Sequence, residues 1–412
     1  SGKLSVRYTP SGFIFDSKGS TLFSDTNLLY ILSLLNSKVN MLFMDVLCPT
    51  LDFNPGQIAK VPLPLDKSNI NLLEQRAKEN IGIMKKEWDS YEISWDFIEH
   101  PLIKNIINDS IEETYDVYAK GSELNYNTIK KNEQEIDQIL SKMYNFSSEM
   151  LNSFDYNDIT YRLNDRTRDI KSLISFFVGI IFGRFTLSDR YFNIKEEVND
   201  ICSQVKNGAL ALHSEMGLNN GLDTLVIELI RLIYGKNSFK KNLDFISNEI
   251  GRKFNESSEE AINRYLYNDF INDHIKTYQK LPIYWLFDSG KKSAFKCLIY
   301  IHKYNEDTLA TINSQYLLPK STRLKYELYE LNNQLIKADD KTRRILEKEK
   351  VVLENKYNEI IEYGQVLDHM ANRYISIDLD DGVKVNYEKF QGIEIVTDSG
   401  TRIKKDLLVP IK

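Results

Sequence analysis

The residue types that could carry out catalysis or bind metal are scattered along this sequence. The five histidines form no HExxH or HxxxH pair, so the common helical metal sites are not encoded. The three cysteines, Cys48, Cys202 and Cys297, lie far apart without a CxxC pair, which argues against a thiolate zinc site and a disulfide framework. The sequence also lacks a glycine-rich phosphate loop and a GxSxG elbow. We therefore expect no catalytic residue and no metal site in this chain.

One short segment is close to a catalytic loop without matching it. Amino-methyltransferases hold the target amine with an Asn-Pro-Pro-Tyr loop, whose aromatic ring stacks on the flipped base. Here Asn54-Pro55 is followed by Gly56 and Gln57. No motif that could bind a methyl donor precedes the segment, so we interpret it as a turn.

The distribution of charge is more informative than its total. The chain has 53 Lys and Arg against 59 Asp and Glu, a net charge of −6, which by itself argues against a nucleic-acid partner. Between residues 280 and 325, however, eight basic residues face three acidic ones, so this stretch carries +5. Basic and aromatic residues together can neutralise phosphates and pack against bases or sugars. The alternative is that the aromatic residues belong to the core and the lysines are solvated. The aromatic residues concerned are Tyr284, Trp285, Phe295, Tyr300 and Tyr304.

A smaller basic patch lies in the first twenty residues, where Lys3, Arg7 and Lys18 face a single acidic residue, Asp16. Residues 4–16 are rich in β-formers and are broken by Pro10 and Gly12, which predicts two short strands around a turn. The patch would then lie on strands or on the loops that join them.

Length and composition describe an ordinary globular chain. At 412 residues, with 42% hydrophobic and 27% charged residues, we expect two or three domains. The most apolar run, residues 172–183, is about half of the roughly 20 residues that a membrane span needs, so it predicts a buried core helix. No signal peptide is visible. We therefore expect a cytoplasmic protein without a membrane partner.

Helical periodicity dominates the sequence. It predicts a helix over 27–46, mainly helices from 69 to 150, a strongly apolar helix over 165–185 and several shorter ones up to 270. Leu324, Leu328, Leu331 and Leu335 have the spacing of a coiled coil. A polar joint at 338–341 precedes a second polar helix, which predicts an antiparallel helical hairpin.

The last fifty residues contain a strong β-hairpin signal. Residues 374–387 alternate apolar and polar side chains on both sides of Asp381-Gly382. We thus expect a mainly α fold with a small α+β amino-terminal portion, a long coiled-coil-like helical hairpin and a carboxy-terminal β-hairpin. The predicted domains are 1–66, with strands and a helix; 67–319, which is α-helical; 320–368, the helical hairpin; and 369–412, the β-hairpin segment.

Several blocks resemble a known family in one consistent order. The run SGKLSVRYTPSGFIFD at 1–16, LLNSKV at 34–39 and PTLDFN at 49–54 resemble a target-recognition region. DIKSLISFFVGIIFGR at 169–184, LPIYWLFDSGK at 281–291 and DLDDGVKVNY at 378–387 resemble the carboxy-terminal half of the same proteins, and SWDF at 94–97 recurs in them. Together these blocks resemble the PglX family, the adenine-specific DNA methyltransferases of BREX phage-exclusion systems.

The resemblance implies an enzyme that transfers a methyl group from S-adenosylmethionine to N6 of adenine in a non-palindromic site, which marks host DNA. The family's methyltransferase domain, with its donor-binding and Asn-Pro-Pro-Tyr loops, has no counterpart here. Catalysis and S-adenosylmethionine binding are therefore expected of the full-length protein, and no catalytic or cofactor-binding residue is assigned to this chain. The resemblance therefore implies that this chain contains the end of the target-recognition domain and the helical carboxy-terminal region.

The expected partner is double-stranded DNA, together with other BREX subunits. We expect Lys3, Ser5, Arg7 and Tyr8 to read base edges, because short polar and basic side chains on a strand or turn can enter a groove. Lys291, Lys292 and Lys296 would hold phosphates. The alternative is a protein-interaction scaffold that docks other defence-system subunits through the helical hairpin and does not read DNA itself.

Overall fold

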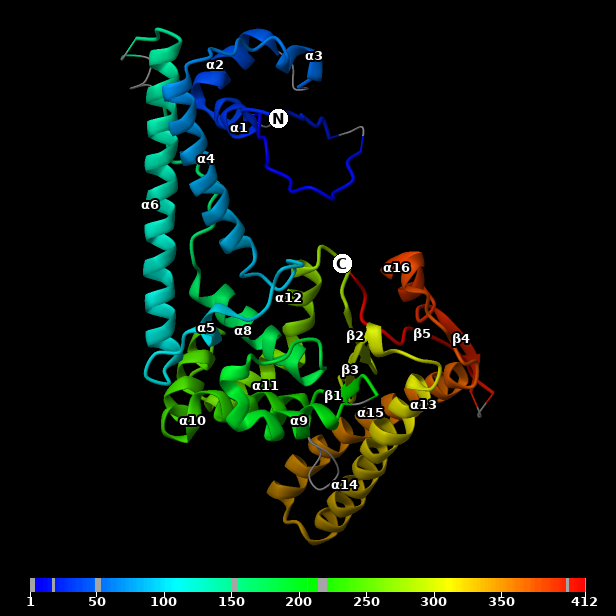
Figure 1. The fold of residues 1–412 in the computed structure, drawn as a ribbon. Coiled ribbons are helices and arrows are strands. Elements are labelled where there is room, and N and C mark those ends of the chain that lie inside the picture. The colour runs from blue at the N-terminus through cyan, green and yellow to red at the C-terminus, as the bar shows by residue number, and fades with distance from the viewer. Residues whose placement is uncertain are drawn as a thin grey trace. The chain divides into compact units, whose positions relative to one another are not determined.

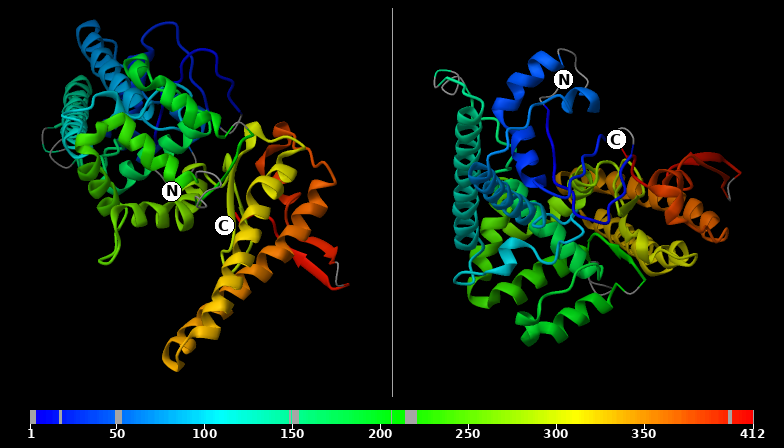
Figure 2. Two further views of the ribbon diagram at one scale, coloured as in Figure 1. Left: turned by 90° about the horizontal axis from the view of Figure 1, so that it is seen from below. Right: turned by 45° about the horizontal axis from the view of Figure 1, so that its top comes forward.

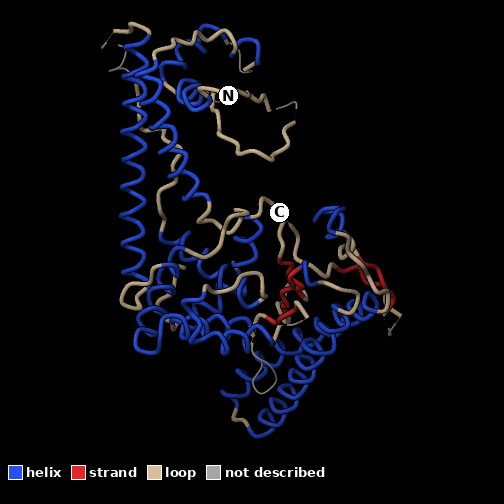
Figure 3. The backbone as a smooth tube through the Cα atoms, in the orientation of Figure 1, coloured by secondary structure: helices blue, strands red, loops and turns tan. Residues whose placement is uncertain are grey.

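The structure of the protein is a computed structural model that describes residues 4–16, 19–48, 53–147, 149, 154–205, 207–213, 221–397 and 400–411. The chain forms two compact units. The first comprises Ser1–Phe97 and Tyr115–Asp165, and the second comprises Ile98–Thr114 and Arg166–Lys412. Helices make up most of both units, and the strands are few and short (Figures 1 and 3), so the predicted mainly α fold is confirmed. The four predicted domain boundaries stay a prediction.

The first unit is helical and has its own apolar core. Leu34, Val39, Leu73 and Leu140 are completely buried in it. The buried Asp137 side chain binds the N-terminus of the helix that begins at Lys38, since its Oδ1 accepts from the Lys38 backbone N–H at 2.8 Å. The helices are α1 (Leu28–Asn36), α2 (Lys38–Leu47), α3 (Pro55–Ile58), α4 (Lys67–Trp88) and most of α6 (Ile111–Met143).

The two strands predicted over residues 4–16 do not form; this segment is irregular. Its apolar side chains do pack inward, because Leu4 is buried in the core of the first unit and Val6 lies against it. The backbone there finds its hydrogen-bond partner in a side chain of α1, not in a neighbouring strand. Without a partner strand, β-forming residues cannot build a ladder.

The second unit contains the strongly apolar helix that the sequence predicts. This helix is α8 (Arg166–Ile181), and from Ile170 to Ile181 its large apolar side chains are almost fully buried. Across the described ranges, no helix is long and apolar enough to cross a membrane. The other helices of this part of the unit are α5 (Pro101–Lys104), a 3₁₀ helix (Asp189–Ile194), α9 (Lys195–Ser203), α10 (Leu222–Glu249), α11 (Ser258–Asn268) and α12 (Phe270–Thr277). Of these, α9 and α10 pack against α8.

An antiparallel sheet also belongs to the second unit. Its strands are β1 (Ala209–Ala211), β2 (Tyr284–Asp288) and β3 (Lys296–Tyr300), in the order β1-β3-β2. Trp285 and Phe287 on β2 are buried, as are Tyr284 and Phe295. These four aromatic residues of the basic stretch therefore form core, while Tyr300 and Tyr304 are half-buried.

The predicted helical hairpin is present. After α13 (Thr308–Ile312) and a π-helical turn (Asn313–Leu317), α14 (Leu318–Lys337) and α15 (Asp340–Ala371) lie side by side (Figures 1 and 2). Asp339 begins the second helix, because its carboxylate accepts from the backbone N–H of Thr342 at 2.8 Å. Leu324 and Leu331 are buried in the hairpin. Coiled-coil packing along its full length stays a prediction.

The carboxy-terminal β-hairpin exists, but the predicted location is wrong. Residues expected on its strands form a 3₁₀ turn (Leu379–Asp381) and α16 (Gly382–Glu388), and the strands come later, as β4 (Ile393–Val396) and β5 (Arg402–Lys405). The Asn386 side chain holds the helical form, because it accepts from the Asp378 N–H at 3.0 Å and donates to the Gly382 carbonyl at 2.9 Å. Tyr387 then packs edge-on against Trp285 in the core.

Candidate nucleic-acid interface

The loop between β2 and β3 carries the adjacent lysines Lys291 and Lys292. Both side chains are exposed. Across the described part of the chain, neither ammonium group has a hydrogen-bond or ion-pair partner. The base of the loop is closed by two hydrogen bonds, from the Ser289 N–H to the Phe295 carbonyl at 3.0 Å and from the Phe295 N–H to the Ser289 hydroxyl at 2.9 Å. The loop thus presents two positive charges from a fixed base.

A carboxylate from another element holds this loop. Glu359, on α15, accepts from the Ser289 hydroxyl at 2.8 Å, from the Lys292 backbone N–H at 2.7 Å and from the Ala294 N–H at 3.2 Å. Gly290 has a φ of +130°, and a Cβ built there would lie 3.2 Å from Glu359 Oε2. The carboxylate and the loop therefore fit closely, and a side chain at Gly290 would crowd that fit.

Lys296 differs from the two loop lysines, although the sequence predicts that all three hold phosphates. Only 9% of its side chain is exposed, and its ammonium donates to the Tyr267 carbonyl at 2.9 Å. It also lies 3.5 Å from Asp288 Oδ2 and 4.4 Å from the centre of the Tyr267 ring. Burial raises the pKa of Asp288, and the nearby ammonium opposes this shift. In this structure the charge of Lys296 is engaged within the protein.

Polar side chains from distant segments surround Lys296. The Tyr267 hydroxyl donates to the Ser293 carbonyl in the β2–β3 loop at 2.5 Å, and the imidazole of His213 stacks on the Tyr267 ring at 4.4 Å. His213 Nδ1 lies 2.9 Å from the buried Asp223 carboxylate. Sequence inspection misses these residues, as it misses Glu359, because they come from elements far apart in the chain and form no motif.

The other predicted contacts belong to the first unit. Leu4 and Val6 turn toward the core, so Ser5 and Arg7 turn outward as extended backbone requires, and both are exposed, as is Tyr8. The Arg7 guanidinium donates only to the neighbouring Val6 carbonyl, at 3.1 Å, among the hydrogen bonds of the described residues. Lys3 lies outside the described residues. Ser5, Arg7 and Tyr8 are thus exposed in the structure, and base reading stays a prediction.

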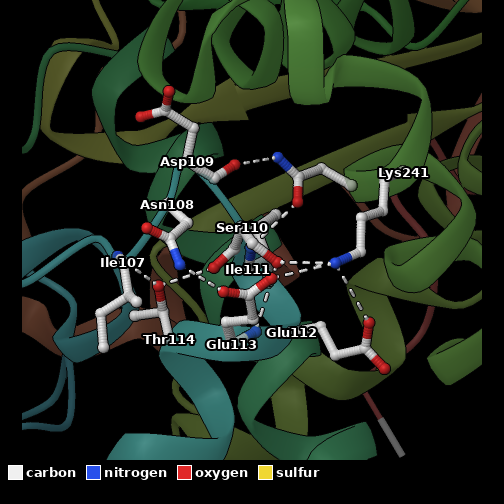
Figure 4. Close-up of polar contacts among 10 residues, drawn as sticks. Ile107, Asn108, Asp109, Ser110, Ile111, Glu112, Glu113, Thr114 and Lys241 are labelled. Carbon is white, nitrogen blue, oxygen red and sulfur yellow. Dashed lines mark hydrogen bonds and ion pairs between the residues drawn. The ribbon is translucent and has the colours of Figure 1, made fainter.

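A second polar cluster, at the beginning of α6, has a structural explanation (Figure 4). Asn108 and Asp109 form a tight turn with φ of 49° and 52°. These angles lie in the left-handed backbone region, which residues other than glycine rarely adopt. Asn242 of α10, which is fully buried, holds the turn: it accepts from the Ile111 N–H at 2.9 Å and donates to the Asp109 carbonyl at 2.7 Å. Lys241 adds an ion pair with Glu113 at 3.2 Å.

This cluster offers no built ligand site. An open depression of about 530 Å³ lies beside it and is lined by both charge signs, including Glu112, Lys240 and Asp244. Its charges are largely paired, since Asp244 binds Arg252 at 2.9 Å. Among the residues that the structure describes, no group of three or more His, Cys, Asp or Glu side chains could hold a metal ion. The cationic β2–β3 loop therefore remains the stronger candidate for ligand binding.

Comparison with known proteins gives this geometry its context. No family model matches the chain. It is 33% identical over 416 residues to the adenine-specific methyltransferase PglX of Lacticaseibacillus casei (strain Zhang). This alignment covers 95% of the chain and 34% of the relative. It is also 34% identical over 423 residues to the adenine-specific methyltransferase BrxX of Escherichia coli O9:H4 (strain HS). That alignment covers 94% of the chain and 34% of the relative. The chain spans about a third of the length of the curated relatives it matches. Along almost its whole length, the chain is therefore a PglX/BrxX-type sequence.

Proposed function

We propose that this chain is a DNA-contacting part of an adenine-specific DNA methyltransferase of a BREX defence system. The similarity to PglX and BrxX supports the methyltransferase class. Within this proposal the full-length protein methylates N6 of adenine in a non-palindromic site and takes the methyl group from S-adenosylmethionine. This chain recognises the target site and contacts the phosphate backbone of the DNA, and its own residues carry out no part of the methyl transfer.

The observation that carries the proposal is the pair of unpaired ammonium groups on the clamped β2–β3 loop. Lys291 and Lys292 are adjacent and exposed, and the loop that carries them is held by hydrogen bonds from the Lys292 and Ala294 N–H groups to Glu359. Neutralising phosphates supplies a large share of the affinity of a protein for duplex DNA, and a loop whose backbone is already fixed loses less entropy on binding than a mobile one. In this proposal Lys291 and Lys292 hold phosphates, while Lys296 supports the strand from inside the fold.

Base reading belongs to the first unit in this proposal. Ser5, Arg7 and Tyr8 are exposed on a segment that is fixed to α1. Arginine can pair with two acceptors on a guanine edge, and serine or tyrosine can exchange single hydrogen bonds with bases. The three side chains therefore have suitable chemistry for contacts that depend on sequence.

The test is the affinity of the chain for a labelled DNA duplex, measured by fluorescence anisotropy at low salt. Replacing Lys291 and Lys292 together by alanine should weaken binding on the order of tenfold, equally for all duplexes, since phosphate contacts carry no sequence information. The matched control is Lys130→Ala with Lys131→Ala, which removes the same two charges from α6. A wild-type chain that does not bind DNA at low salt would overturn the proposal.

The helical hairpin favours a second candidate function, a docking scaffold for other BREX subunits. Several large apolar side chains of α14 and α15 are exposed, among them Tyr329 at 62% and Ile336 at 79%. Tyr329 and Ile336 are seven residues apart and so lie on one face of α14, and apolar residues gathered on one exposed face are typical of protein interfaces. Replacing Tyr329 and Ile336 by serine should then abolish capture of purified BREX subunits and leave DNA affinity unchanged. Loss of DNA affinity without loss of capture would contradict the scaffold function.

A further inference from the structure

We propose that Glu359 is a positioning residue for DNA binding, which sets the conformation in which the β2–β3 loop presents Lys291 and Lys292. This inference rests on the proposed function, because it concerns the same loop. It assigns a role to a negatively charged residue of the helical hairpin, one that neither charge nor motif in the sequence singles out. The role is indirect: Glu359 contacts the loop, and the loop contacts the phosphates.

The three donors around Glu359 show how the loop is fixed. Oε1 accepts from the Ser289 hydroxyl and the Ala294 N–H, while Oε2 accepts from the Lys292 N–H. The donors lie before, within and after the exposed tip, so one carboxylate defines both sides of the loop. Hydrogen bonds to an ionised acceptor are shorter and stronger than neutral ones. One of them ends on the backbone of Lys292 itself, which ties this lysine directly to α15.

The chemistry requires a carboxylate of this length. A glutamine at this position would keep one acceptor oxygen but turn the other into an NH₂ group, which would face an N–H or hydroxyl donor of the loop. At least one of the three hydrogen bonds would be lost, because two donors would then face each other across it. Aspartate is one methylene shorter and could not reach all three donors from the same helix position.

Simple electrostatics and the positioning role predict opposite outcomes for Glu359→Gln. A carboxylate beside a DNA-binding surface repels phosphates, so removing its charge alone should strengthen binding to a polyanion. If Glu359 positions the loop, the same substitution weakens binding despite the gain in net positive charge. The sign of the effect therefore separates the two explanations.

The experiment measures duplex affinity of the whole chain by anisotropy over a series of salt concentrations. We expect Glu359→Gln to weaken binding about fivefold to tenfold and to lower the salt dependence toward that of the double lysine variant. The matched control is Glu362→Gln, on the same helix, whose 56% exposed side chain pairs with Lys405 at 3.3 Å and, among the described residues, forms no hydrogen bond with the loop. This control should bind as tightly as wild type or slightly more tightly.

A double-mutant cycle distinguishes positioning from general damage. In the Lys291→Ala, Lys292→Ala background, Glu359→Gln should have no further effect, because the cations that it positions are gone. An equal loss in both backgrounds would overturn the inference. If Glu359→Gln does not fold, Gly290→Ala reaches the same clamp from the loop, since its Cβ would crowd Glu359 Oε2, and the same loss is expected.

The failure of this inference differs from the failure of the proposed function. If the double lysine variant loses affinity while Glu359→Gln and Gly290→Ala bind like wild type or more tightly, only the positioning role is wrong. If the double lysine variant itself binds DNA like wild type, the phosphate-contact function of the loop is wrong, and the positioning role falls with it.

Discussion

Asn36, the last residue of α1, forms two hydrogen bonds with the backbone of Val6. Its side-chain oxygen accepts from the Val6 N–H at 2.9 Å, and its side-chain nitrogen donates to the Val6 carbonyl at 3.0 Å. An asparagine side chain here replaces the neighbouring strand that a β-ladder would supply. Because Val6 lies between Ser5 and Arg7, this pairing determines where the predicted base-reading side chains point.

Replacing Asn36 by alanine should therefore release the amino-terminal segment. We expect faster amide exchange in residues 4–16 and a loss of roughly 1–2 kcal/mol of stability, because the Val6 N–H loses its partner and the Val6 carbonyl keeps only the Arg7 guanidinium. Hydrogen exchange with mass spectrometry measures the first effect. Asn69→Ala is the control, since its amide bonds only to the exposed Asp66 carboxylate among the described residues. Unchanged exchange in residues 4–16 would show that Asn36 does not hold the segment.

Arg7→Ala tests base reading separately from phosphate binding. If Arg7 contacts a base edge, its loss should cost about 1–3 kcal/mol on the cognate duplex and much less on a scrambled one. The measurement is the ratio of the two affinities, with the double lysine variant as the contrasting case, since that variant should weaken both duplexes equally. Equal losses on both duplexes for Arg7→Ala would remove its reading role.

Asn242→Ala tests the anchor at the beginning of α6. Asn242 is fully buried and satisfies both the Ile111 N–H and the Asp109 carbonyl, so its removal leaves the buried Ile111 N–H unpaired and takes a donor from the partly buried Asp109 carbonyl. We expect a loss of roughly 2–4 kcal/mol in the free energy of unfolding, measured with urea. Asn237→Ala, at an exposed position of the same helix, should stay within about 0.5 kcal/mol of wild type. Similar values for both variants would contradict the anchoring role.

The two units should respond differently to acid. Burial lowers the pKa of His100 and of His274 in the second unit to about 3. Since the unfolded chain binds these protons near pH 6.5, the stability of the second unit is fully present above that pH. It should fall by up to about 1.4 kcal/mol per pH unit for each histidine as the pH drops toward 3.

The contribution of Asp137, in the first unit, to folding stability depends on pH in the opposite direction. Burial raises its pKa to about 6, so the carboxyl takes up a proton in the folded state before it does so in the unfolded chain. Its contribution favours folding at low pH and is lost as the pH rises through 6. Hydrogen exchange at pH 7 and pH 5 should therefore show greater loss of protection in the second unit than in the first. Equal losses in both units would contradict this assignment.

Local periodicity predicted the parts of the fold that local contacts stabilise. The buried α8 and the α14–α15 hairpin follow directly from apolar spacing and from the polar joint near Asp339. The hairpin expected over 374–387 is wrong because its alternating residues Val383 and Tyr387 are also four apart, a spacing that suits a helix as well. The Asn386 side chain, which bonds back to Asp378, stabilises the helix.

The site was predictable only in part, for a different reason. Sequence charge located Lys291, Lys292 and Lys296 together, but the register that places Lys296 opposite Asp288 is a property of the β2–β3 pairing. Glu359 lies 70 residues from Ser289, and no local pattern links them. Contacts between elements far apart in the chain decide which charges are free and which are engaged, and a single sequence does not encode them in a readable motif.

The dependence of DNA affinity on salt, compared between the wild-type chain and the Lys291→Ala, Lys292→Ala variant, tests phosphate binding by the β2–β3 loop most directly. Two lost phosphate contacts should make the slope of log affinity against log salt shallower by about 1.8. Parallel lines for the two proteins would contradict the assignment of Lys291 and Lys292 as the residues that hold phosphates.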